Sequence, residues 1–309
     1  MRKFISFLLL AVMLMSLLTA CGVDNSAETT VATQPAIDLG EPLCDGTTLK
    51  ILFIGNSFSD DVNTYLYDVL TAEGVTNIVL GKLYYGGCTI KRHAGNAAND
   101  IAEYTYSRNT SGVWEKTENA TMLFALKNDD WDIISLQQAS TQSGVADSYN
   151  EDLDALITYV NENKTNPDAK LVWHMTWAYQ SDSTHSSFPT YGNDQMNMYN
   201  MTCDAVQQQI ETRDVFSAII PVGTAIQNAR TSYFGDTLTR DGFHLNDFGK
   251  LIGSYTWYAA LTGKTLETIN LNSLSEWFTL SDSNKAVVIE AVNGALENPY
   301  SVTQSTLTE

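Results

Sequence analysis

The sequence predicts an α/β fold: a three-layer α/β/α sandwich around a doubly wound, flavodoxin-like sheet of five parallel strands. Apolar runs of strand length, such as 49–54, alternate along the chain with segments whose apolar residues recur at helical spacing, such as 153–160. Strands that alternate with helices pair in parallel through right-handed crossovers. Helices are therefore expected on both faces of one open sheet.

Each element has its own signal in the sequence. The run 49–54 is almost continuously apolar up to Gly55, as expected of a strand buried on both faces. The next segment, 59–73, has apolar residues at helical spacing and stops at Gly74. By the same criteria, strands are predicted at 76–83, 131–136, 170–177 and 216–222, and helices at 120–127, 153–160, 196–210 and 248–261.

Two segments fall outside this alternation. Residues 104–119 carry the turn sequence Asn-Thr-Ser-Gly at 109–112 between aromatic residues, which predicts a small hairpin inserted at the surface. Residues 265–309 are predicted to form an extension with a helix around 284–296, packed on the main domain of residues 48–264.

The first twenty residues are predicted to be a targeting segment. Arg2 and Lys3 precede an apolar stretch, 4–18, that is short for a spanning helix. Residues 18–21 read Leu-Thr-Ala-Cys, which resembles the lipobox of bacterial lipoproteins. The resemblance implies cleavage before Cys21, lipidation of that cysteine and an extracytoplasmic, lipid-anchored protein. An ordinary secretory signal with an incidental cysteine is the alternative.

The rest of the chain is polar at first and acidic throughout. Residues 21–47 have the composition of a disordered tether. Without residues 1–20 the chain carries 15 Lys and Arg against 36 Asp and Glu, a net charge of −21. This charge disfavours nucleic acid as a partner, so any membrane attachment should come through the lipid anchor alone. The sequence does not pair Cys44, Cys88 and Cys203, but their odd number leaves at least one outside any intramolecular disulfide.

Polar residues follow several predicted strands, at the sheet edge where α/β proteins bind ligands. Ser57 follows the first strand and begins a helix, where backbone N–H groups are unpaired. Asp241 and His244 lie three residues apart in one loop before the helix 248–261. A serine becomes a nucleophile when a histidine takes its proton and a carboxylate orients that histidine. The pattern predicts a triad of Ser57, His244 and Asp241.

These motifs resemble those of the SGNH (GDSL-type) hydrolase superfamily. The sequence Gly-Asn-Ser at 55–57 stands where the family has Gly-Asp-Ser, and Gly87 stands at its oxyanion glycine. The sequence Asp-Gly-Phe-His at 241–244 fits its final Asp-x-x-His block. The resemblance implies an ester hydrolase whose oxyanion hole includes the backbone N–H groups of Ser57 and Gly87. A narrower likeness, to an uncharacterised branch of secreted bacterial lipoproteins, rests on the motifs at 55–59, 86–93, 131–138, 176–179 and 240–245.

The chain departs from the superfamily pattern in two places. Asn56 replaces the usual aspartate. The asparagine that donates to the oxyanion is absent, and the sequence there, 135–140, reads Ser-Leu-Gln-Gln-Ala-Ser. A glutamine amide is also a donor, so Gln137 is expected to complete the oxyanion hole, with Gln138 as the alternative. Further possible substrate contacts are Asn56, His93, Gln138 and Trp177.

Each candidate residue also has a structural interpretation. Ser57 could simply cap the following helix, and Ser59 is the second candidate for the nucleophile. His244 could form a purely structural pair with Asp241. His93 could be a surface or core residue, and Trp177 could only pack. His185 lies in a polar stretch, 181–187, that could cover the site.

The favoured hypothesis is a serine esterase that removes O-acyl groups, such as acetyl, from extracellular carbohydrate. The substrate is expected to be a small-molecule or polysaccharide ester, and the superfamily also includes lipases and thioesterases. No cofactor or metal is expected, because no zinc-type or dinucleotide-binding spacing occurs. The alternative from another class is a catalytically silent lipoprotein that binds glycans in the same cleft.

Overall fold

The computed structural model describes residues 42–309 except 45 and 276–277. The predicted signal peptide, Cys21 and most of the predicted tether lie outside these residues. Among the helices in the described part of the chain, none is long and apolar enough to span a membrane.

The described chain folds around a seven-stranded sheet with the strand order β4-β3-β2-β1-β5-β6-β7. Five of these strands, from β2 to β7 across the sheet, are parallel and have the flavodoxin-like order. The strands are β1 (Thr48–Gly55), β2 (Asn77–Tyr84), β3 (Tyr104–Asn109), β4 (Trp114–Ala120), β5 (Ile133–Leu136), β6 (Lys170–His174) and β7 (Phe216–Ile220). The predicted α/β class is therefore confirmed.

The predicted number of five strands is wrong, because the hairpin of β3 and β4 extends the sheet. Strand β3 pairs antiparallel with β2, placing Tyr106 opposite Leu83, and β4 pairs antiparallel with β3. The side chain of Asn109 closes the turn by accepting the N–H groups of Ser111 and Gly112. An unpaired β2 would expose a row of backbone hydrogen-bonding groups, which the hairpin satisfies.

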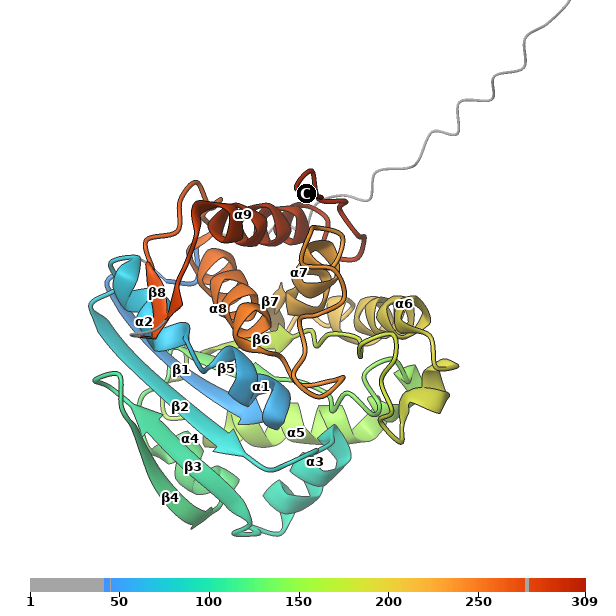
Figure 1. Cartoon of the computed structure of the whole chain (residues 1–309). Helices are drawn as coiled ribbons and strands as arrows, with labels where there is room; N and C mark the ends of the chain where they lie inside the picture. Colours follow the sequence, from blue (N-terminus) through green and yellow to red (C-terminus); the bar gives the residue numbers. More distant parts are fainter. Residues whose placement is uncertain (1–41, 45, 276–277) are drawn as a thin grey trace, which may run out of the picture. The chain divides into compact units, whose positions relative to one another are not determined.

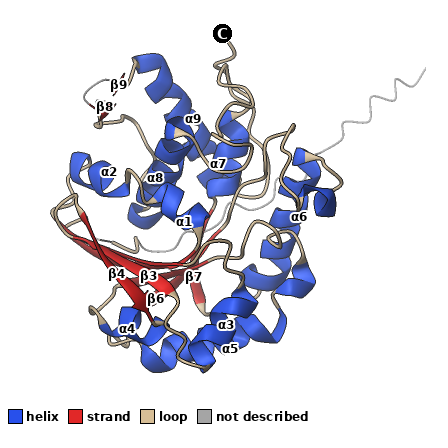
Figure 2. Cartoon of the chain, turned by 60° about the horizontal axis from the view of Figure 1, so that its bottom comes forward, coloured by secondary structure: helices blue, strands red, loops and turns tan. Residues whose placement is uncertain are grey.

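Helices cover both faces of the sheet, as Figures 1 and 2 show. Helices α1, α2, α7 and α8 lie on one face and α3, α4 and α5 on the other, while α9 packs outside α7 and α8. The helices are α1 (Ser57–Val62), α2 (Leu66–Ala72), α3 (Ile90–Ala98), α4 (Met122–Lys127), α5 (Asn150–Asn163), α6 (Gln195–Val206), α7 (Val222–Ala229), α8 (Asp247–Thr262) and α9 (Asp282–Glu297). A separate two-stranded sheet joins β8 (Ser273–Ser275) to β9 (Phe278–Thr279).

The structure differs from the expected helices in three places. The segment 59–73 forms two helices, α1 and α2, separated by a turn at 63–65 in which the Asn63 amide donates to the carbonyl of Ser59. Helices α3 and α7 are not predicted. Helix α3 does have a local signal, since Thr89 caps its N-terminus by accepting the N–H of Arg92.

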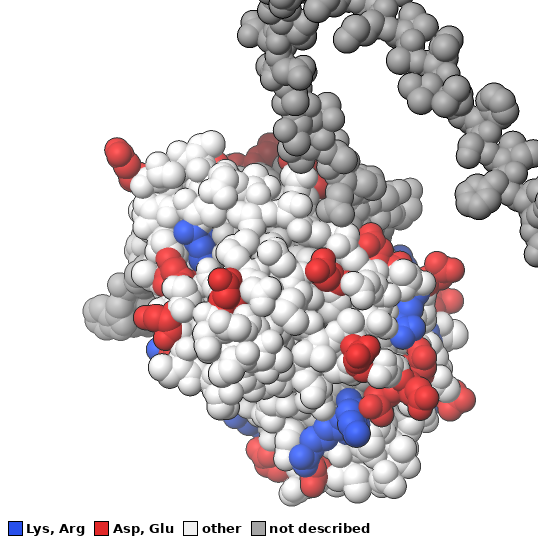
Figure 3. Space-filling model, turned by 90° about the vertical axis from the view of Figure 1, so that its right-hand side faces the viewer, with Lys and Arg blue, Asp and Glu red and all other residues white. Residues whose placement is uncertain are grey.

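The core around the sheet is rich in aromatic residues. Trp131, Trp173, Trp177 and Trp257 are all fully buried. Cys88 and Cys203 are buried thiols, and no disulfide joins Cys44 to Cys88. The face shown in Figure 3 carries acidic side chains among few basic ones, in keeping with the acidic composition.

We expect the close packing of α8 on α1 to make Gly253 sensitive to substitution. A Cβ atom at this position would lie 2.6 Å from Val62 Cγ1, a stiff and buried neighbour. The Gly253→Ala variant should lose about 1–3 kcal/mol of unfolding free energy in urea denaturation. In contrast, Gly95 in α3 has open space around the position of its missing Cβ. Gly95→Ala should therefore gain about 0.5–1 kcal/mol, and equal effects in the two variants would contradict this view of the packing.

Candidate active site

Ser57 is the first residue of α1, directly after the carboxyl end of β1. Asn56 caps this helix, since its Oδ1 accepts the N–H of Phe58 at 3.0 Å. Ser57 is therefore not the cap, and its hydroxyl and N–H have no hydrogen-bond partner among the described residues. The hydroxyl of Ser59 is buried and donates to the carbonyl of Asn56 at 2.9 Å. The geometry thus favours Ser57 over Ser59 as a nucleophile.

The buried amide of Asn56 joins three segments behind Ser57. Its Nδ2 donates to the carbonyl of Cys88 at 3.1 Å, after β2, while its Oδ1 also accepts the Gln137 amide at 2.8 Å, after β5. An asparagine meets both demands because it carries one donor and one acceptor, whereas an aspartate carboxylate could only accept. These bonds account for an asparagine rather than an aspartate at position 56.

Asp241 and His244 form a pair within the loop before α8. One oxygen of Asp241 accepts His244 Nδ1 at 2.7 Å, and the other accepts the backbone N–H of His244 at 2.8 Å. Gly242 between them has φ of +90°, and a Cβ there would press on Ser183. Partial burial acts to raise the pKa of Asp241, but the hydrogen bonds from His244 and Phe243 outweigh it and lower the pKa below its ordinary value. Asp241 therefore remains an ionised partner for His244.

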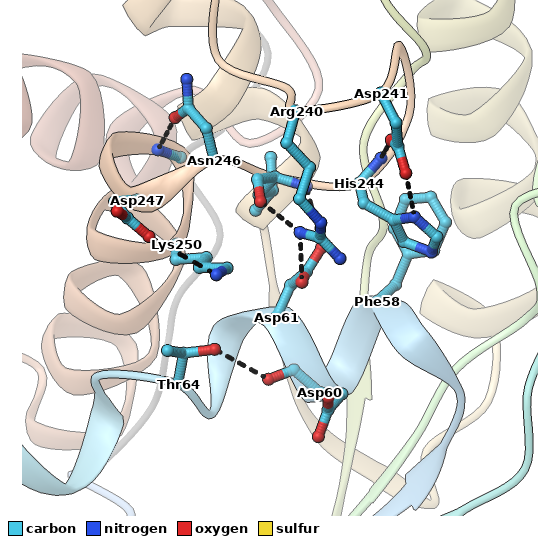
Figure 4. Close-up of polar contacts among 12 residues, drawn as sticks. Phe58, Asp60, Asp61, Thr64, Arg240, Asp241, His244, Asn246, Asp247 and Lys250 are labelled. Carbon is cyan, nitrogen blue, oxygen red and sulfur yellow. Dashed lines mark hydrogen bonds and ion pairs between the residues drawn. The ribbon is translucent and has the colours of Figure 1, made fainter.

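A second carboxylate, Asp61, fastens this loop to α1, as Figure 4 shows. Its Oδ1 accepts the guanidinium of Arg240 at 2.8 Å, and its Oδ2 accepts the N–H of Leu245 at 2.8 Å. Arg240 also donates to the carbonyl of Leu245. Burial raises the pKa of the Asp61 carboxyl, and the bonds from Arg240 and Leu245 oppose that rise. The contact places the histidine loop beside the helix that carries Ser57.

These segments enclose a pocket of about 400 Å³ at the carboxyl edge of the sheet. Its wall includes Ser57, Gly87, Thr141, His185, Arg240 and His244. Nδ1 of His244 is taken by Asp241, and Nε2 has no partner among the described residues. The pocket therefore brings a free serine hydroxyl, a free imidazole nitrogen and Gly87 into one cavity.

Two predicted oxyanion donors line the pocket and the third does not. The N–H groups of Ser57 and Gly87 have no partner in the described part of the chain. Gln137 is buried outside the pocket wall and gives its amide N–H to Asn56. The expectation that Gln137 completes the oxyanion hole is corrected accordingly, because its side chain is buried against Asn56 and does not line the pocket.

Three of the expected substrate contacts are not brought to the pocket. Gln138 is buried, with its oxygen accepting the N–H of Ile90 and its nitrogen donating to Ser148. His93 is buried against Tyr104, 3.0 Å from its hydroxyl. Trp177 is fully buried against Phe58, with ring centroids 4.1 Å apart. Among the expected contacts, only Asn56 lines the pocket, and its amide is engaged as described.

Other groups at the site are not predicted from the sequence. The sequence motif 240–245 includes Arg240 but predicts no partner for it, and Asp61 is a carboxylate one turn after Ser57 for which the sequence predicts no contact. Cys88 lies beside the Gly87 loop, but burial raises the pKa of its thiol to about 12, so it stays protonated and poorly nucleophilic. Within the described residues no cluster of three or more His, Cys, Asp or Glu could hold a metal ion.

Comparison with known proteins identifies the family to which this chain belongs. Residues 50–276 match the family model described as a domain of unknown function, DUF4886. The chain belongs to the DUF4886 family. A DUF4886 protein from Bacteroides uniformis, with a crystal structure, is 38% identical with a TM-score of 0.77, covering 84% of this chain and 98% of the other.

More distant likenesses reach beyond the DUF4886 family. A candidate SGNH hydrolase from Slackia heliotrinireducens is 19% identical with a TM-score of 0.44, covering 71% of this chain and 100% of the other. An acetylxylan esterase from Geobacillus stearothermophilus is 12% identical with a TM-score of 0.45, covering 70% of this chain and 95% of the other. No curated protein matches the sequence.

The contact between Asp61 and Arg240 should be needed to hold the histidine loop. In Asp61→Asn the ionic bond to Arg240 is lost, and the variant should be less stable by about 1–3 kcal/mol in urea denaturation. Asp130→Asn is the control, because this carboxylate is exposed and forms no ion pair with the described residues. Its effect should be within about 0.5 kcal/mol, and a comparable loss there would refute a special role for Asp61.

The requirement for an amide at position 56 gives a pH-dependent prediction. Asn56→Asp places a carboxylate against the carbonyl of Cys88 and should cost about 1–3 kcal/mol at pH 7. Burial should raise the pKa of the introduced carboxyl above its unfolded value. The loss should therefore shrink as pH falls through that raised pKa, because the protonated group can donate again. Denaturation between pH 4 and 8, with the exposed Asn161→Asp as control, tests this; a loss independent of pH would contradict it.

Proposed function

We propose that the protein is a serine-dependent ester hydrolase of the SGNH superfamily. The observation that carries the proposal is that an unpartnered Ser57 hydroxyl and the free edge of His244 line one pocket, with His244 held by Asp241. A serine, a histidine and an orienting carboxylate are the parts that acyl transfer requires. The match of the sequence motifs to that superfamily supports the same reaction.

The proposed reaction proceeds through an acyl-enzyme. Ser57 Oγ attacks the ester carbonyl while His244 Nε2 takes its proton, and the N–H groups of Ser57 and Gly87 stabilise the oxyanion. The tetrahedral intermediate expels the alcohol, which receives the proton from His244. Water then gives a proton to His244 and attacks the acyl-enzyme, and the acid leaves as Ser57 regains its proton.

Charge compensation in the pocket favours an uncharged substrate. Arg240 is paired with Asp61, and Asp60 on the pocket wall is paired with Lys82. The lining residues therefore offer no uncompensated cation for a phosphate or carboxylate, as phospholipid or coenzyme A esters would need. A pocket of about 400 Å³ suits a small ligand or one residue of a polymer. We propose O-acyl groups, such as acetyl, on extracellular carbohydrate as the substrate.

The proposed location follows from the N-terminal sequence alone. Lipidation at Cys21 would tether the domain to the outer side of a bacterial membrane, where polysaccharide esters are met. A catalytically silent glycan-binding lipoprotein remains the competing function. The burial of Gln137 favours it in one respect, because the side-chain donor expected at the oxyanion hole does not line the pocket.

Hydrolysis of 4-nitrophenyl acetate separates the two functions. The domain of residues 42–309 should hydrolyse this ester, and Ser57→Ala and His244→Ala should each lower kcat/KM by at least about 10³-fold with the melting temperature retained. Ser111→Ala, which changes an exposed serine in the hairpin turn, should behave as wild type. A fluorophosphonate should label Ser57 in the wild type. Activity equal in wild type and Ser57→Ala, with no labelling, would favour the silent binder.

A further inference from the structure

His185 is an imidazole on the pocket wall that the proposed reaction does not use. It lies in the loop between β6 and α6 and is partly buried. Its Nδ1 accepts the backbone N–H of Ser187 at 3.1 Å, and the backbone N–H of His185 donates to Ser183 Oγ at 3.3 Å. Because Nδ1 accepts, the neutral ring carries its proton on Nε2. The ring therefore presents a donor, which has no partner among the described residues.

The position of this ring relative to His244 is fixed by packing. Phe243 contacts both imidazoles, with its ring centroid 4.6 Å from that of His185 and 4.2 Å from that of His244. Tyr179 packs on the other side of His185, with centroids 4.7 Å apart. The loop that carries His185 is also bonded to the loop that carries His244, since the N–H of Gln180 donates to the carbonyl of Gly242 at 2.8 Å.

The surroundings keep His185 neutral during catalysis. Burial lowers the pKa of His185, the neighbouring His244 lowers it further, and Asp241 opposes them. When His244 becomes an imidazolium in the proposed reaction, this repulsion is strongest. His185 is thus poorly suited to act as a second base, and suited to donate one hydrogen bond in a constant protonation state.

The position of His185 next to His244 indicates which part of the substrate His185 would contact. His244 gives its proton to the departing alcohol, so the alcohol must lie next to His244. His185 is the neighbour of His244 across Phe243, whereas Ser57 and Gly87 hold the acyl carbonyl. An oxygen close to the ester oxygen on the alcohol is the group that would meet the Nε2–H.

We propose that His185 determines specificity by donating its Nε2–H to a hydroxyl or ether oxygen of the alcohol, beside the ester. The preferred alcohol is then a polyol such as a sugar. This inference rests on the proposed ester hydrolysis and deepens it, because it names the group that distinguishes a carbohydrate ester from a simple alkyl ester. The hydroxyl of Thr141, which also lines the pocket and has no partner among the described residues, offers a further polar contact for such a group.

The test compares two acetates that differ only in neighbouring hydroxyls, propyl acetate and glycerol 1-acetate, with 4-nitrophenyl acetate as a reference. Two substitutions separate the donor from the loop turn. In His185→Gln the distal amide can replace the Nε2–H but the bond from Ser187 is lost. In His185→Asn the side-chain oxygen can keep the bond from Ser187, as in an Asx turn, but the distal donor is gone. Initial rates are followed by acid release, and melting temperatures confirm folding.

The wild type should prefer glycerol 1-acetate over propyl acetate in kcat/KM. His185→Asn should lower this preference roughly three- to tenfold, the worth of one neutral hydrogen bond, while His185→Gln should keep most of it. Hydrolysis of 4-nitrophenyl acetate, whose alcohol carries no neighbouring hydroxyl, serves to normalise the rates of each variant, so that the preference is compared independently of overall activity. A preference that is unchanged in His185→Asn, or lost equally in both variants, would overturn the role of His185 alone. A wild type inactive on all three esters would instead refute the proposed function, and this inference with it.

Discussion

The contact between Asp61 and the segment Arg240–Leu245 is the constraint on which the candidate site depends. Ser57 begins α1 near the start of the domain, and His244 precedes α8 near its end. Asp61 lies one turn after Ser57 and is buried, with one oxygen on Arg240 and the other on the N–H of Leu245. A buried carboxylate that loses its partners is costly, so the loop has one strongly favoured position against α1. The placement of His244 relative to Ser57 therefore depends on a buried carboxylate that has no part in the proposed triad.

Asn56 also holds the candidate site in place, from the ends of the strands beneath the pocket. Its amide connects the ends of β1, β2 and β5 through Cys88 and Gln137, so the three loops that could form an oxyanion hole are set by one side chain. This arrangement uses the Gln137 donor and leaves the N–H groups of Ser57 and Gly87 unpaired at the pocket. In the proposed reaction the oxyanion would therefore be stabilised by these backbone donors, which the strand ends hold in place, rather than by a side chain.

Local signals in the sequence predicted the features that depend on near neighbours. Alternating apolar runs gave the parallel strands, and three-residue spacing was enough to predict the contact between Asp241 and His244, which forms within one loop. Features that depend on distant partners were missed or misplaced. The hairpin of β3 and β4 joined the sheet because β2 offered a free edge.

The sequence by itself determined the α/β class, the residues at the strand ends and the identity of the three candidate catalytic side chains. Hydrophobic periodicity and short loops encode these directly. Tertiary structure alone decided that Gln137 turns to Asn56, that His93 and Trp177 are buried, and that His185 lies beside His244. The physical reason is that a side chain at a strand end bonds to whichever polar group folding brings near it, and the sequence does not record which segment that will be.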